Sequence, residues 1–157
     1  MPLHKSIAVV AVTAVALVTA AEQVVDLSGA WHLNVEKSRW GKHPKPHSVV
    51  VNIVHNEPAL KYSGIAVAAN GEDTREFSFE GAIDGKEYLI TGAFGEGKIA
   101  IRRVSPTTTA SVFKSNDGNV VETATTTVSA DGRTLRREIK VKGPEGEMSW
   151  TEIYERR

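Results

Sequence analysis

The sequence contains no cysteine, and this absence excludes several kinds of chemistry at once. A chain without thiols has no disulfide framework, no thiolate metal site, no cysteine nucleophile and no lipid-modified bacterial cysteine. The sequence also lacks an excess of charge, because 19 Lys and Arg residues are balanced by 19 Asp and Glu residues. Nucleic-acid-binding domains normally carry a basic excess or stripe, so we expect no nucleic-acid partner.

Aromatic residues are also few, at 6%, yet hydrophobic residues make up 41% of the chain. That proportion is enough for a packed core and too high for an intrinsically disordered chain. The length of 157 residues fits a single domain. We find no internal repeat and no low-complexity tract, so we expect one domain over residues 22–157.

The first 21 residues predict a secretory signal peptide. Lys5 supplies a positive start, residues 7–18 form an apolar run, and small side chains follow. The alternative is an anchoring transmembrane helix, but the run falls short of the ~20 residues that span a bilayer. We expect cleavage after Ala20 or Ala21, a secreted or periplasmic protein, and no stable membrane anchor afterwards.

From Asp26 onward the sequence consists of short runs rich in Val, Ile, Thr, Phe and Tyr, and it shows no convincing helical period. Asn-Gly or Asp-Gly pairs lie between several of these runs and indicate hairpin turns. The expected strands cover residues 28–36, 48–55, 59–68, 74–81, 87–92, 98–104, 109–115, 119–129, 133–142 and 147–155. Because the connections are short, strands that are neighbours in sequence should pair as an antiparallel up-and-down meander.

A meander of this length must protect its two edge strands, and closure into a barrel removes both edges. The predicted fold class is therefore all-β, an antiparallel up-and-down meander closed into a barrel of about 8–10 strands. An open sandwich is the structural alternative.

Alternation of side chains along each strand indicates which residues face inward, because the apolar set should line the barrel. Three arginines share the apolar face of their strands, namely Arg75, Arg103 and Arg137. They would make the interior electropositive and could hold an anionic ligand group through a bidentate guanidinium. Alternatively, each one lies at a strand end, reaches water, or stacks on Trp31. We rank Arg137 first because it lies away from the strand ends, with Glu152 as its available partner.

Aromatic side chains complete the set of candidate cavity or core residues. They are Tyr62, Phe77, Phe79, Tyr88, Trp150 and Tyr154. A run of threonines at 123 and 125–127 could line a moderately polar pocket, but we favour an outward position, since Thr is a good strand former.

Residues 38–48 form the longest irregular stretch, because two prolines and a glycine prevent regular pairing. This stretch is either a polar surface loop or a lid over a cavity. His43 and His47, with His55 or Glu57, could chelate a metal only with further ligands, so we interpret the histidines as exposed loop residues. We expect no metal and no cofactor. No nucleophile elbow, zinc-protease motif or phosphate-binding loop is present, so we identify no catalytic residue.

The Gly29-x-Trp31 pair at the start of the first predicted strand resembles the first signature of the lipocalins. Residues 29–38 read Gly-x-Trp-x-Leu-Asn-x-x-Lys-Ser, a pattern similar to that of a group of small secreted bacterial proteins with a lipocalin-like barrel. The resemblance implies that Gly29 and Trp31 form a structural plug at the closed end of the barrel. It also implies an arginine over the Trp, for which Arg103, Arg137 and Arg156 are candidates.

Other features of the lipocalins and related barrel families are only partly present in the sequence. The Thr-Asp-Tyr signature of the lipocalins is absent. Ten strands resemble fatty-acid-binding proteins or nitrobindins more than eight-stranded lipocalins. However, the sequence shows neither the helical pair of the fatty-acid-binding proteins nor the haem-binding histidine of the nitrobindins.

These observations favour a secreted or periplasmic binding or carrier protein with a small apolar or amphipathic ligand in its barrel. That ligand can carry an anionic group. Two other classes stay open: a filled-core interaction or structural module, and a cavity-based enzyme such as an isomerase, cyclase or hydrolase. The interior volume separates them, since a cavity of about 300 Å³ or more supports a ligand.

Overall fold

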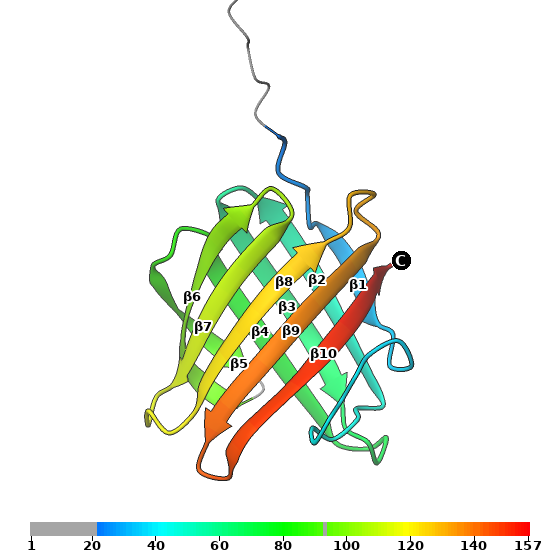
Figure 1. Ribbon diagram of the computed structural model, residues 1–157, viewed down its shortest axis with the longest axis vertical. Coiled ribbons are helices and arrows are strands. Elements are labelled where there is room, and N and C mark those ends of the chain that lie inside the picture. Colours follow the sequence, from blue (N-terminus) through cyan, green and yellow to red (C-terminus); the bar gives the residue numbers. More distant parts are fainter. Residues whose placement is uncertain (1–21, 93) are drawn as a thin grey trace, which may run out of the picture.

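Ten antiparallel strands close into a barrel in the computed structural model, which describes residues 22–92 and 94–157 (Figure 1). The strands are β1 (Gly29–Leu33), β2 (Ser48–Asn56), β3 (Ala59–Val67), β4 (Thr74–Ala82), β5 (Glu87–Gly92), β6 (Gly95–Ser105), β7 (Thr108–Ser115), β8 (Val121–Val128), β9 (Thr134–Gly143) and β10 (Gly146–Arg156). Each strand pairs with its neighbour in sequence, and β1 also pairs with β10. The predicted all-β barrel is confirmed, and the open sandwich is excluded.

The predicted signal peptide, residues 1–21, lies outside the described residues. Within the part of the chain that the structure describes, no helix is long and apolar enough to cross a membrane.

The first strand ends earlier than predicted, at Leu33 instead of residue 36. Asn34 starts a turn, because its side-chain oxygen accepts the N–H of Lys37 at 3.0 Å and its carbonyl accepts the N–H of Ser38 at 3.2 Å. Such local bonds compete with the strand ladder. The chain then runs through an irregular connection, residues 34–47, before β2 begins.

The β8–β9 hairpin shows how the predicted turns form. The hydroxyl of Ser129 donates to Asp131 at 2.6 Å, and the N–H of Thr134 donates back to Ser129 Oγ at 3.0 Å. Gly132 follows with a φ of +71°, which an L side chain rarely adopts. The β7–β8 turn repeats this arrangement with Ser115 and Asp117.

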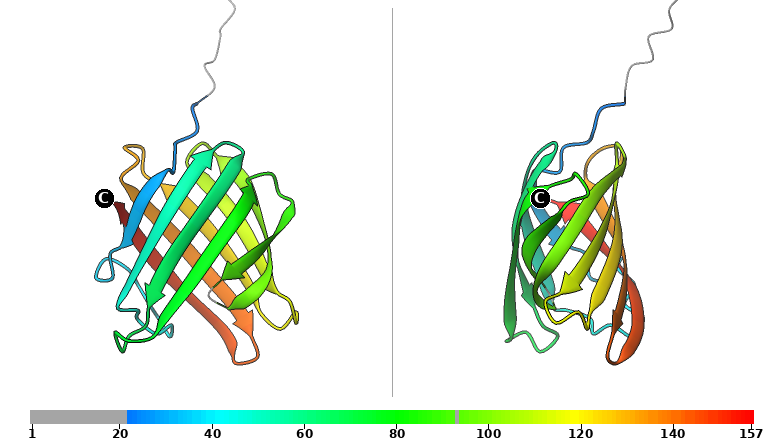
Figure 2. Two further views of the ribbon diagram at one scale, coloured as in Figure 1. Left: turned by 180° about the vertical axis from the view of Figure 1, so that it is seen from behind. Right: turned by 90° about the vertical axis from the view of Figure 1, so that its left-hand side faces the viewer.

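The two ends of the barrel differ. The plug end holds the start of β1, the end of β10 and the hairpins β2–β3, β4–β5, β6–β7 and β8–β9 (Figure 1). The loop end holds the other four hairpins and the connection 34–47. Strands cross the wall obliquely, as a closed barrel requires (Figure 2). The shortest paired stretch of the wall lies between β4 and β5, which share two residue pairs where β3 and β4 share nine.

Trp31 closes the plug end. Its side chain is 1% exposed, and its Nε1 donates to the carbonyl of Leu27 at 2.8 Å. The guanidinium of Arg156 lies over the ring, 4.6 Å from the centroid, so Arg156 is the one of three candidate arginines that covers the Trp. Gly29 has a φ of +129°, and the Arg156 stem lies 3.7 Å from the position of a Cβ there. Gly29, Trp31 and Arg156 thus pack together at this end of the barrel.

Candidate functional site: the interior cavity

A cavity of about 280 Å³ lies inside the barrel, between the Trp31 plug and the loop end. This volume lies just below the ~300 Å³ at which pockets for small ligands usually begin. Most of its wall is apolar, because the inward positions of the strands carry branched and aromatic side chains, including Val51, Ile53, Leu60, Phe77, Ile99, Ile101 and Phe113. The interior is therefore not filled by its own side chains.

One side of the wall, on β8, β9 and β10, carries an interior ion cluster that consists of Arg137, Glu122 and Glu152. The two terminal nitrogens of Arg137 donate to Glu152 Oε2 at 3.2 Å and to Glu122 Oε1 at 3.3 Å. Arg137 faces Glu152 directly across the β9–β10 ladder. The predicted partnership of Arg137 with Glu152 is thus present, and Glu122 joins it from β8.

The two carboxylates of the cluster have different surroundings. Glu152 accepts from Trp150 Nε1 at 2.9 Å and from the Tyr154 hydroxyl at 3.0 Å, in addition to Arg137. Among the described residues, Arg137 is the sole side chain that donates to Glu122. Glu152 is therefore well satisfied, whereas Glu122 keeps hydrogen-bonding capacity that the protein does not use.

Burial changes the ionisation of this cluster. Burial raises the pKa of Glu122 more than the charge of Arg137 lowers it. Burial alone would lower the pKa of Arg137, but the carboxylates of Glu152 and Glu122 outweigh that effect and raise it, so the guanidinium stays charged. The Arg137 side chain is 31% exposed although it lies deep in the barrel, because that surface faces the cavity.

Tyr62 brings a hydroxyl from β3 to the same cavity. Its ring stacks on Phe79 with centroids 5.2 Å apart, and burial raises the pKa of its phenol to about 12, so the group stays neutral. Thr109, Ser111 and Thr126 add further hydroxyls to the lining. The cavity therefore combines an apolar wall with a polar region that offers both donors and acceptors.

The connection 34–47 covers part of the loop end. Trp40, His43 and Pro46 all line the cavity, and the His43 ring stacks on Trp150 with centroids 4.0 Å apart. Burial lowers the pKa of His43 more than Glu152 and the Pro44 backbone raise it. The stretch thus combines the two alternatives: most of its residues are exposed, as in a surface loop, while these three side chains cover part of the cavity.

Four of the predicted cavity residues lie at its edge or away from it. Arg75 is exposed and borders the cavity near the loop end. Arg103, Phe79 and Tyr88 do not border it. Arg103 is drawn to Glu57 near the plug end by two hydrogen bonds of 3.0 and 2.6 Å. Phe79 is buried in the core, and the Tyr88 hydroxyl donates to Asp84 at 2.8 Å.

The predicted electropositive interior is therefore corrected. The interior ion cluster contains two carboxylates and one guanidinium, and Arg103 is neutralised by Glu57. The other predicted residues, namely Tyr62, Phe77, Trp150, Glu152, Tyr154 and Arg137, all line the cavity.

The histidines that the structure describes do not assemble into a metal site. Within residues 22–92 and 94–157, no group of three or more His, Asp or Glu side chains is placed to hold an ion. The interpretation as exposed loop residues holds for His47 but is wrong for His43, which is half-buried, and for His55, which lies on β2 with a side chain 3% exposed. At the plug end His55 Nε2 lies 2.6 Å from Glu57, and its Nδ1 accepts the N–H of Leu27 at 3.1 Å.

Sequence reasoning missed Glu122, although the signal was present. Glu122, Ala124, Thr126 and Val128 share one parity on β8, and Ala124 and Val128 are buried. The threonines that drew attention lie on both faces: Thr126 lines the cavity, while Thr123 and Thr125 are exposed.

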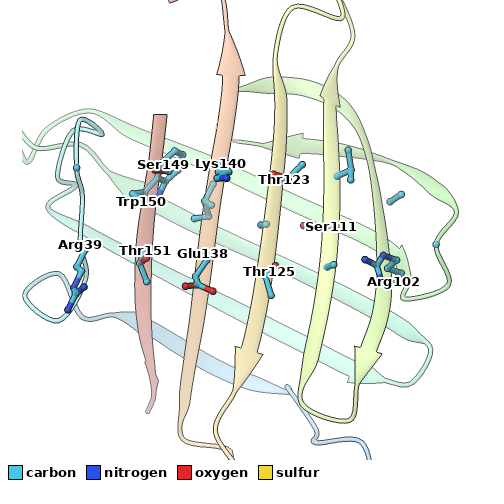
Figure 3. A pocket seen from close by; sticks show the side chains of 17 residues that line it. Arg39, Arg102, Ser111, Thr123, Thr125, Glu138, Lys140, Ser149, Trp150 and Thr151 are labelled. Carbon is cyan, nitrogen blue, oxygen red and sulfur yellow. The ribbon is translucent and has the colours of Figure 1, made fainter. Parts of the chain in front are cut away.

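A second, broader hollow of about 810 Å³ lies on the outer face of β6–β10 (Figure 3). Its labelled side chains include Arg102, Thr123, Thr125, Glu138 and Lys140, all of which are exposed, so this hollow is an open groove. It is larger than the interior cavity but has no buried polar cluster, so the interior is the stronger candidate site.

Comparison with known proteins supports the fold. No protein-family model matches the sequence, and no curated protein is significantly similar to it in sequence. The zebrafish ileal bile acid-binding protein, complexed with cholic acid, matches with a TM-score of 0.57 and 14% identity, over 83% of this chain and 98% of that chain.

Two further solved structures show the same architecture. Secretory abundant heat soluble protein 4 from Ramazzottius varieornatus matches with a TM-score of 0.57 and 13% identity, over 88% of this chain and 99% of that chain. The Schistosoma mansoni fatty acid binding protein, in complex with arachidonic acid, gives a TM-score of 0.50 and 12% identity, over 83% of this chain and 96% of that chain. The chain thus has the ten-stranded, calycin-like barrel fold of these proteins.

Proposed function

We propose that this protein binds a small, largely apolar or amphipathic molecule inside its barrel and acts as a carrier or binding protein. The observation that carries the proposal is the 280 Å³ cavity, which is lined mainly by apolar side chains and has one polar region. Binding pockets for small molecules combine these two features. The neighbours with cholic acid and arachidonic acid support the same kind of occupant.

The proposed setting is outside the cytoplasm. The positive start at Lys5, the apolar run 7–18 and the small residues that follow support export. A chain without cysteine needs no particular redox compartment in order to fold.

The proposal is tested by filling the cavity. Ala66 borders the cavity on β3, and the adjacent Ile65 is 49% exposed on the outer face. We expect the neutral fluorescent probe 1-N-phenylnaphthylamine to bind the purified protein saturably, at one site per chain. Ala66→Phe should weaken binding about tenfold or more because the ring occupies the space of the ligand, whereas the matched Ile65→Phe should not.

Fluorescence titration measures both affinities, and a thermal melt of each variant checks that it is folded. Absence of saturable binding to the wild-type protein would contradict the proposal. So would equal affinity of the wild type and a folded Ala66→Phe variant.

A further inference from the structure

The charges inside the barrel restrict which polar group a ligand can bring. Four charged side chains line the cavity within the described residues, and they are Arg75, Glu122, Arg137 and Glu152. Arg75 is exposed, so solvent screens its charge. The interior ion cluster remains, with one positive group and two carboxylates.

The hydrogen bonds show which of the two carboxylates has an acceptor oxygen that the protein does not use. Glu152 already receives three donors and neutralises Arg137. Glu122 has one contact, to Arg137 Nη2 at 3.3 Å, which is longer than the ~2.7–2.9 Å of a strong charge-assisted bond. Its side chain is 14% exposed and lines the cavity, so a donor that enters the cavity can reach it.

We propose, as an extension of the function proposed above, that the buried polar end of the ligand is an uncharged or cationic hydrogen-bond donor, an alcohol or an amine, received by Glu122. Such a group supplies the donor that Glu122 lacks. A carboxylate at the same place would lie beside two carboxylates, and like charges in a low-dielectric interior repel strongly. The raised pKa of Glu122 agrees with a carboxyl group whose charge is not fully compensated.

A matched series of ten-carbon compounds tests this proposal. Decylamine, 1-decanol and decanoic acid compete with 1-N-phenylnaphthylamine for the purified protein, each below its aggregation threshold. We expect the amine and the alcohol to bind about tenfold more tightly than the acid, the scale of one hydrogen bond to a charged group. Glu122→Gln should raise the affinity for decanoic acid and lower it for decylamine.

Glu76→Gln is the control, because Glu76 is exposed on β4 and its substitution changes the net charge equally. The preference for the amine and the alcohol over the acid is measured on the wild-type protein. The proposal can therefore be tested even if Glu122→Gln folds poorly. If the acid binds as tightly as the other two compounds, this inference fails while the cavity function stands. If a folded Glu122→Gln keeps the wild-type preference, the assignment to Glu122 fails. If neither the dye nor the series binds, the proposed function itself fails.

Discussion

At the scale of single residues, the plug gives the sharpest test of how the barrel is stabilised. Trp31 is 1% exposed, is hydrogen-bonded to Leu27 and is covered by Arg156. We expect Trp31→Ala to lower the free energy of unfolding by roughly 3–5 kcal/mol, the usual loss when a buried aromatic side chain is truncated to alanine. Urea denaturation measures this difference.

Trp31→Phe separates packing from hydrogen bonding at the same position. It keeps an aromatic ring and loses the 2.8 Å bond to the Leu27 carbonyl, so its cost should be smaller than that of Trp31→Ala. The half-buried Trp40 provides a comparison in the connection 34–47, where truncation should cost less. A loss below about 1 kcal/mol for Trp31→Ala would mean that the plug contributes little to stability.

At the scale of elements, the connection 34–47 should make stability depend on pH through His43. Burial lowers the pKa of this imidazole below its ordinary value of 6.5. Near that value the unfolded chain binds the proton more readily than the folded chain, so stability is full above about 6.5 and decreases as the pH falls toward the folded pKa. His43→Phe keeps a ring against Trp150 but cannot titrate.

We therefore expect the loss of unfolding free energy between pH 7 and pH 5 to be smaller in His43→Phe than in the wild type. Carboxyl groups such as Glu122, whose raised pKa acts in the opposite direction, contribute equally to both proteins and cancel in the comparison. His47→Gln is the control, because His47 is an exposed histidine of the same connection. An unchanged pH slope in His43→Phe would show that the His43–Trp150 stack does not bury the imidazole in solution.

At the scale of the whole molecule, the fold was predictable because residues close together in the sequence determine each strand and turn. Each hairpin depends on a short turn and on alternation within two adjacent strands, so all ten strands match the predicted ranges to within three residues at each end. The largest differences are the early end of β1 at the Asn34 turn and the early start of β6. The site was less predictable, because it depends on registers and on chain closure. Alternation places Arg137 inward, but it does not place Glu122 beside it or direct Arg103 toward Glu57.

The mature chain should start just before the first residues that contact the barrel. The described barrel contacts begin after the predicted cleavage site: Val25 donates its N–H to the Pro106 carbonyl at 3.1 Å, and Leu27 donates to His55 at 3.1 Å. A chain that begins between Ala21 and Gln23 keeps both contacts. We therefore expect mass spectrometry of the exported protein to find its N-terminus in that interval, and the shortened chain to melt at the temperature of the full-length protein. Recovery of intact residues 1–157 in a membrane fraction would contradict export by cleavage and favour the anchoring helix.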